Sequence, residues 1–93
     1  MNRQTAVKAR RSDRWIVPNP HKPEVAEAWV LPKHVSVWVI VRQLEIEGGQ
    51  ADVVADVFDL PIAAVDAARA YYEQHRAAID ERIARNRAFF AAR

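Results

Sequence analysis

The sequence contains no cysteine and only two glycines, which stand together as Gly48 and Gly49. Without cysteine, a disulfide framework and a thiolate zinc site are both excluded. The longest unbroken apolar run, residues 37–41, is far too short to span a bilayer. The N-terminus is basic but lacks the apolar stretch of a secretory signal. These absences favour a cytoplasmic protein that makes no membrane contact.

The sequence also lacks the usual marks of a catalytic or metal site. His21, His34 and His75 are scattered, and none has a metal-ligand spacing to another histidine or to a carboxylate. Gly48-Gly49 is not followed by the Lys-Ser/Thr pair of a phosphate-binding loop. We therefore expect no enzyme activity, no catalytic residue, no metal and no cofactor. His75 is expected to pack against an apolar surface.

What is present is a small, apolar chain with charge placed unevenly. The 93 residues fit one domain, and 51% of them are hydrophobic, which excludes wholesale disorder. A chain of this length buries only about 60–65% of its unfolded surface, so its core is marginal by itself. A second copy or a partner is therefore expected to help, and we predict a homodimer.

Both ends of the chain are basic and the centre is acidic. Residues 1–14 hold five basic residues against one acid, residues 15–78 hold five against nine, and residues 79–93 hold four against two. A basic arm of this kind either binds phosphate or serves as a solvated tail. The basic residues of the arm are Arg3, Lys8, Arg10, Arg11 and Arg14.

The chain divides into four predicted segments. Residues 1–13 form the basic flexible arm, and residues 14–34 are extended, with four of the five prolines and short strands at 14–17 and 27–31. Pro32-Lys33-His34 forms a tight link. Residues 35–78 form a helical core, and residues 79–93 form a C-terminal helical extension.

Three helices are predicted from residue 35 onward. Residues 35–47 have strand propensity but helical periodicity, so we expect a strand to end near Val35 and a helix, capped by Ser36, to run to residue 47. Residues 50–58 form a short second helix, and residues 59–61 form a turn in which Pro61 marks a helix start. Residues 62–93 contain no glycine or proline and predict one long helix. Its apolar stripe is Val65, Ala68, Tyr72, His75, Ile79, Ile83, Asn86 and Phe90.

This order is typical of a mainly α, winged-helix-like helix-turn-helix domain with short N-terminal β-strands and a long C-terminal helix. In such a domain the second helix of the unit enters the major groove of DNA. Arg69 is its one residue suited to a bidentate contact with guanine, while Asp52, Asp56, Asp59 and Asp66 repel phosphate. We expect the arm to supply most of any affinity for DNA. The exposed residues at the start of this helix are predicted to be Pro61, Ile62, Ala63, Ala64, Asp66 and Arg69.

The stretch LPIAAVDAARAYYEQHRAAIDERIARNRAFF, residues 60–90, carries a resemblance to a known family. Together with the VWVIV segment before Gly48, it resembles a bacterial family first catalogued as a domain of unknown function, number four hundred and thirty-three, which is associated with antitoxins of VapB type. The resemblance covers about sixty residues, and its most specific block is AYY..HR..ID..I. The chain departs from the family at Pro32-Lys33-His34 and at Pro61, where a Gly-Thr-Arg segment and a Ser or Thr cap are usual.

The resemblance implies a helix-turn-helix antitoxin that represses its own promoter and neutralises a PIN-type ribonuclease toxin. Two adjacent phenylalanines near the C-terminus cannot both face a small core, and exposed aromatics beside arginine are typical interface anchors. One of the arginines, Arg87 or Arg93, is expected to pair with carboxylates in the ribonuclease metal site. The predicted toxin-binding residues are Arg82, Arg85, Arg87, Phe89, Phe90 and Arg93.

Two other functions fit the same sequence. The chain is alternatively a stand-alone helix-turn-helix transcriptional regulator, or a homodimeric interaction module that does not bind DNA. A neighbouring gene for a small ribonuclease separates the antitoxin from both alternatives.

Overall fold

The computed structural model describes residues 14–92, and helices dominate this part of the chain. Short N-terminal strands are followed by four α-helices, the last of them long, which confirms the expected fold class. Within the described residues, no helix is long and apolar enough to cross a bilayer. In chain order the elements are β1 (Ile16–Val17), the 3-10 helix η1 (Val25–Glu27), β2 (Trp29–Val30), β3 (Val35–Ser36), α2 (Val37–Ile46), α3 (Ala51–Phe58), α4 (Ile62–Gln74) and α5 (Arg76–Ala91).

The strands form a small antiparallel sheet with the order β1-β2-β3. Val30 of the central strand pairs with Ile16 on one side and with Val35 on the other. Each strand has only two residues, fewer than predicted. After β1 the chain leaves the sheet in a turn, in which the Asn19 side chain accepts from the N–H groups of His21 and Lys22 at 2.9 and 3.2 Å.

Helix α2 forms where residues 35–47 were ambiguous, and the helical periodicity prevails over the strand propensity. Its predicted apolar face is buried throughout: Val37, Ile40, Val41 and Leu44. The helix ends as expected at the glycine pair, where both residues have positive φ and the N–H of Gly49 donates to the carbonyl of Leu44 at 2.7 Å.

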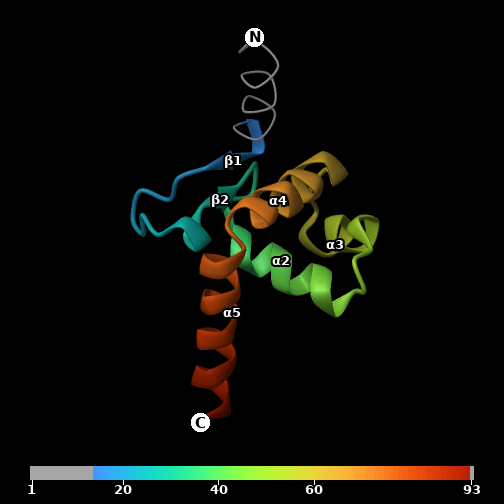
Figure 1. The fold of residues 1–93 in the computed structure, drawn as a ribbon. Helices are drawn as coiled ribbons and strands as arrows, with labels where there is room; N and C mark the ends of the chain where they lie inside the picture. Colours follow the sequence, from blue (N-terminus) through green and yellow to red (C-terminus); the bar gives the residue numbers. More distant parts are fainter. Residues whose placement is uncertain (1–13, 93) are drawn as a thin grey trace.

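The core is built around α2, which contacts β3, η1, α3, α4 and α5 (Figure 1). β3 and η1 pack against one part of α2, and α3 and α4 pack against another part of the same helix. The largest fully buried side chains come from β2 and from each of the four α-helices: Val30, Val37, Ile40, Val54, Val65 and Ile79. One continuous core therefore spans the chain from β1 to the first half of α5.

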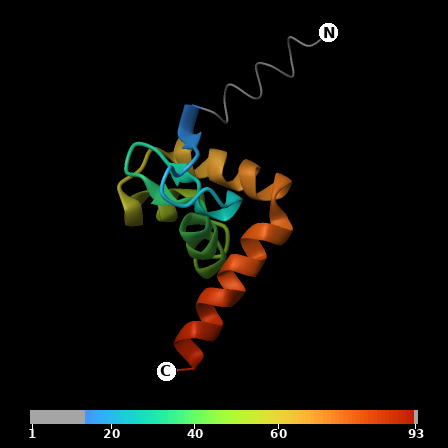
Figure 2. The ribbon, with the colours of Figure 1, turned by 90° about the vertical axis from the view of Figure 1, so that its left-hand side faces the viewer.

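The predicted single helix over residues 62–93 is divided in two by His75. This residue has φ −134° and ψ 37°, and α5 leaves α4 at an angle (Figure 2). The bend returns Ile79 and Ile83 to the core, where they are 0% and 6% exposed. Burying each isoleucine contributes about 1.5–3 kcal/mol, which outweighs about 1 kcal/mol for a lost helical hydrogen bond.

Candidate DNA-binding and partner-binding surfaces

Helices α3 and α4 form a helix-turn-helix unit joined by the predicted three-residue turn. Asp59 adopts the left-handed conformation (φ 56°, ψ 51°), and the N–H of Leu60 donates to the carbonyl of Ala55 at 2.8 Å. This pattern closes the end of α3 and reverses the chain direction. Pro61 then precedes the first turn of α4, and its carbonyl accepts from the N–H of Ala64 at 3.0 Å.

The exposed face of α4 is small and mostly uncharged at its start. Ile62 is 51% exposed, and Asp66 and Arg69 follow it at helical spacing on the same face. Ala64, which was predicted to be exposed here, is fully buried because it belongs to the inward face with Val65. The side of the unit that could meet DNA therefore offers two apolar side chains, Ile62 and Ala63, one acid and one arginine on α4.

Arg69 of this unit and Lys33, which lies outside it, both have partners within the domain. The Nη2 of Arg69 donates to the carbonyl of Gly49 at 2.6 Å, and the Nζ of Lys33 lies 3.2 Å from the Oδ2 of Asp59. The exposed acids of the unit are Asp52, Asp56, Asp59, Asp66 and Glu73. The surface is consequently acidic, so it gives no strong attraction for a phosphate backbone without the arm.

Of the five basic residues predicted in the arm, only Arg14 lies among the described residues. Its side chain is exposed, with the guanidinium carbon 5.7 Å from the centre of the Trp15 ring. Arg3, Lys8, Arg10 and Arg11 lie outside the described part of the chain. Because β1 packs against α4, the described part of the chain begins close to the helix-turn-helix unit.

The second half of α5, residues 84–91, projects beyond the core toward the C-terminus (Figure 2). We call this segment the tip of α5, and residues 76–83 its root. Phe89 and Phe90 are 59% and 60% exposed, and their rings meet edge to face at 5.3 Å. Arg87 is exposed, and Arg85 pairs with Glu81 one turn back at 3.2 Å. The predicted site residue Arg93 lies outside the described residues.

Arg82, grouped with the toxin-binding residues by the sequence, is instead engaged inside the domain. Its Nε donates to the Oε2 of Glu27 at 2.7 Å, and its guanidinium carbon lies 4.1 Å from the centre of the Trp38 ring. The other oxygen of Glu27 accepts from the Ser36 hydroxyl and from the Trp38 indole, both at 3.2 Å. The Ser36 hydroxyl therefore donates to this buried carboxylate. Ser36 stands at the N-cap position of α2 as predicted, but its side chain makes no capping hydrogen bond to the helix.

We call Glu27 and the three side chains that bind it, Ser36, Trp38 and Arg82, the Glu27 cluster. Its hydrogen bonds connect the root of α5 to η1 and α2. Burial raises the pKa of Glu27, but the hydrogen bond and the positive charge of Arg82, with the bonds from Ser36 and Trp38, lower it more, so the pKa lies below its ordinary value. Sequence reasoning passed over Glu27. Its signal was a lone charged residue in the otherwise apolar segment VAEAWVL, residues 25–31.

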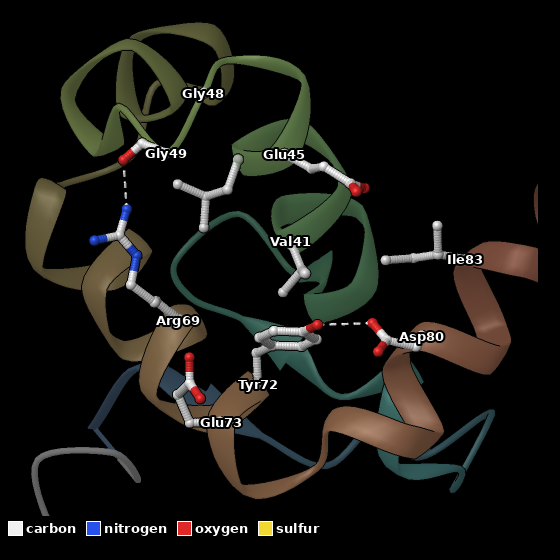
Figure 3. Close-up of a pocket in the computed structure, with 10 residues that line it drawn as sticks. Val41, Glu45, Gly48, Gly49, Arg69, Tyr72, Glu73, Asp80 and Ile83 are labelled. Carbon is white, nitrogen blue, oxygen red and sulfur yellow. Dashed lines mark hydrogen bonds between the residues drawn. The ribbon is translucent and has the colours of Figure 1, made fainter.

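A groove of about 430 Å³ opens between α2, α4 and α5 (Figure 3). In the close-up, Tyr72 lies across its floor and donates to the Oδ1 of Asp80 at 2.8 Å. This hydrogen bond, with burial and the nearby negative charge, raises the pKa of the Tyr72 hydroxyl. The residues that line the groove are Val41, Leu44, Glu45, Gly48, Gly49, Arg69, Tyr72, Glu73, Asp80 and Ile83.

The histidines pack against aromatic rings. His75 lies 4.4 Å from the ring centre of Tyr71, and His34 meets Trp29 edge to face at 4.7 Å. Among residues 14–92, no group of three or more histidine and acidic side chains has a geometry that could hold a metal ion.

No protein-family model, no curated protein and no solved structure matches this chain. Assignment to the antitoxin family therefore depends on the sequence pattern alone.

Proposed function

We propose that this chain is the antitoxin of a type II toxin–antitoxin system, which binds promoter DNA as a homodimeric repressor and neutralises a PIN-type ribonuclease. The observation that carries the proposal is the separation of two surfaces. The helix-turn-helix unit and the entry point of the basic arm lie together, whereas the tip of α5 projects away from them with exposed arginine and phenylalanine side chains.

DNA binding depends mainly on the arm in this proposal, because the described surface of α3 and α4 is acidic. The four basic residues within residues 1–13 would contact phosphates, and Arg69 would stay bound to Gly49 at the edge of the exposed face. Each phosphate contact contributes about −0.9 to the slope of log affinity against log salt, so full engagement of these four gives about −3.6 per chain.

Fluorescence anisotropy with the native upstream DNA tests this role of the arm. The full chain should bind with the steep salt dependence, and a chain of residues 14–93 should lose most of that slope. An Arg69→Ala variant should keep the slope and change sequence preference by less than tenfold. Equal affinity and equal salt dependence for the full and shortened chains would contradict DNA binding through the arm.

Ribonuclease binding is assigned to the tip of α5 without Arg82, because that side chain is held by Glu27. Arg85 and Phe89 lie one turn apart, so they share one side of the tip. An arginine there is suited to forked pairing with carboxylates of a metal site, and an exposed phenylalanine to an apolar pocket.

Co-purification with the product of the neighbouring gene tests this assignment. The double variant Arg85→Ala, Phe89→Ala should lose neutralisation of the ribonuclease and keep promoter binding. The matched control, Lys22→Ala with Val25→Ala, also removes one exposed cation and one exposed apolar side chain, but from residues that lie outside α5. Full neutralisation by the tip variant would place the ribonuclease elsewhere on the chain.

The acidic helix-turn-helix surface favours one second candidate, a homodimeric interaction module without DNA binding. The four exposed aspartates of that surface outnumber its one cation, Arg69, which already donates to the carbonyl of Gly49, and Lys33 beside the unit pairs with Asp59. The anisotropy experiment decides between the two functions, since this candidate predicts no salt-dependent binding of the upstream DNA by the full chain.

A further inference from the structure

The groove between α2, α4 and α5 combines an apolar floor with an acidic rim. Val41, Leu44 and Ile83 form the apolar part. Three carboxylates, from Glu45, Glu73 and Asp80, stand around it (Figure 3). Glu73 pairs with Arg76, Asp80 accepts from Tyr72, and the guanidinium of Arg69 binds the carbonyl of Gly49, so the rim keeps a net negative charge. Such a groove fits a segment that carries positive charge beside a large apolar side chain.

The tip of α5 has this composition. Residues 84–91 contain two arginines, no acid and two phenylalanines that are about 60% exposed. The phenylalanines of the tip therefore suit the apolar part of the groove, and the tip has a net positive charge whereas the rim has a net negative charge. It cannot bend back into its own groove, because it continues the helix whose root forms one wall.

Helical spacing determines which side chains of the tip face the groove side of α5. Arg87 and Phe90 follow Ile83 by four and seven residues, so they lie on the same face as Ile83 and Asp80. Phe89 lies about a third of a turn away, and Arg85 lies on the opposite face. Phe90 stands about 10 Å beyond Ile83 along the axis, at 1.5 Å per residue.

We propose that the tip of α5 from a second copy of this chain fills the groove, with the two α5 helices antiparallel across a two-fold axis near Asn86 and Arg87. An axis midway between Ile83 and Phe90 sets Phe90 of each copy against Ile83 of the other. Both grooves are then filled at once, as a closed two-fold dimer requires. The side of the tip that carries Arg85 and Phe89 is not covered by this contact.

This inference specifies the contact within the dimer of the proposed function and requires neither DNA nor a ribonuclease. Its consequence is a division of the tip into two faces with separate partners. Phe90 and Arg87 face the second copy, whereas Phe89 and Arg85 face outward. The adjacent phenylalanines differ little in exposure but differ in their expected role.

Sedimentation equilibrium of the full chain tests the contact. The unaltered chain should be a dimer at tens of micromolar, and Phe90→Ala should weaken dimerisation about a hundredfold, since two buried anchors are lost per dimer. Phe89→Ala is the matched control and should change dimerisation less than threefold. Circular dichroism should show unchanged helix content in both variants. A monomeric unaltered chain, or equal weakening by the two variants, overturns the proposal.

Single cysteines give a second readout that does not depend on removing an anchor. The chain has no cysteine of its own, so each introduced thiol reports one position. Arg87→Cys should form an intermolecular disulfide rapidly under mild oxidation, because the two copies of this position face each other near the axis. Arg85→Cys loses the same charge on the opposite face and should cross-link at least tenfold more slowly. Equal rates overturn the antiparallel contact, whatever the outcome of the DNA and ribonuclease experiments.

Discussion

The root and the tip of α5 belong to one helix but have different surroundings. In the root, Ile79 is fully buried and Arg82 forms an ion pair with the buried carboxylate of Glu27. In the tip, both phenylalanines are more than half exposed and the charged side chains lie at the surface. The helix continues from one to the other without a break, so the difference comes from what each half contacts.

The comparison separates side chains that stabilise the domain from side chains that are suited to bind a partner. The root contributes to the core through Ile79 and Ile83, so the part of residues 79–93 that projects begins at residue 84. A truncation that removes the tip alone should therefore end after Ile83. A truncation at Ile79 also removes Arg82 and leaves the buried Glu27 without its charged partner.

The largest expected difference between root and tip comes from apolar truncation. Ile79→Ala should lower the free energy of unfolding by about 2–5 kcal/mol, because it leaves a cavity in the core. Phe89→Ala should change it by less than about 0.5 kcal/mol, since its side chain is mostly exposed. Urea unfolding monitored at low protein concentration measures both. Similar losses for the two variants would show that the tip is as much a part of the core as the root.

The charged pair of the root should give the next largest effect. Glu27→Gln keeps the shape of the side chain but removes the charge that pairs with Arg82. It should lower the free energy of unfolding by about 1.5–3 kcal/mol. Glu24→Gln is the control on the same segment, and it should change stability by less than about 0.5 kcal/mol because that side chain is exposed. Equal effects of the two substitutions would contradict the role given to the Glu27 cluster.

Acidification should lower the stability by less than Glu27→Gln does, because a protonated Glu27 side chain keeps its neighbours and loses only its charge. Folding lowers the pKa of this carboxyl, so its contribution is fully present above its unfolded pKa and is lost as the pH falls through the folded pKa. The stability difference between the unaltered chain and Glu27→Gln should therefore narrow from pH 7 to pH 3 in denaturant titrations. A constant difference would mean that Glu27 is not charged at neutral pH in the folded chain.

The sequence predicted α2, α3 and the turn before α4 well because local signals mark their limits. The glycine pair ends α2, and Pro61 precedes α4. The division at His75 had no such signal, since residues 62–93 contain neither glycine nor proline. It arises from burial of Ile79 and Ile83, which depends on where α2 lies in space.

The candidate surfaces show the same limit of sequence reasoning. Composition alone revealed that the tip carries arginine and phenylalanine, but not that Arg82 turns inward to Glu27, 55 residues earlier in the chain. The groove likewise joins three helices, and only the folded chain brings their carboxylates together. Long-range pairing of this kind leaves no periodicity in a single sequence.

The smallest expected effect concerns the ion pair between Glu81 and Arg85, at the junction of root and tip. The two side chains are 64% and 55% exposed and lie one helical turn apart. Exposed pairs of this spacing contribute about 0.3–0.5 kcal/mol, since water already solvates both charges. Glu81→Gln should therefore lower the free energy of unfolding by no more than that amount, and the loss should disappear in 1 M salt, where the screening length is about 3 Å. The loss for Glu27→Gln should largely persist at the same salt concentration, because its pair is buried. Urea titrations of both variants at low and high salt measure the contrast. Equal salt sensitivity of the two pairs would mean that water reaches the root as freely as it reaches the tip.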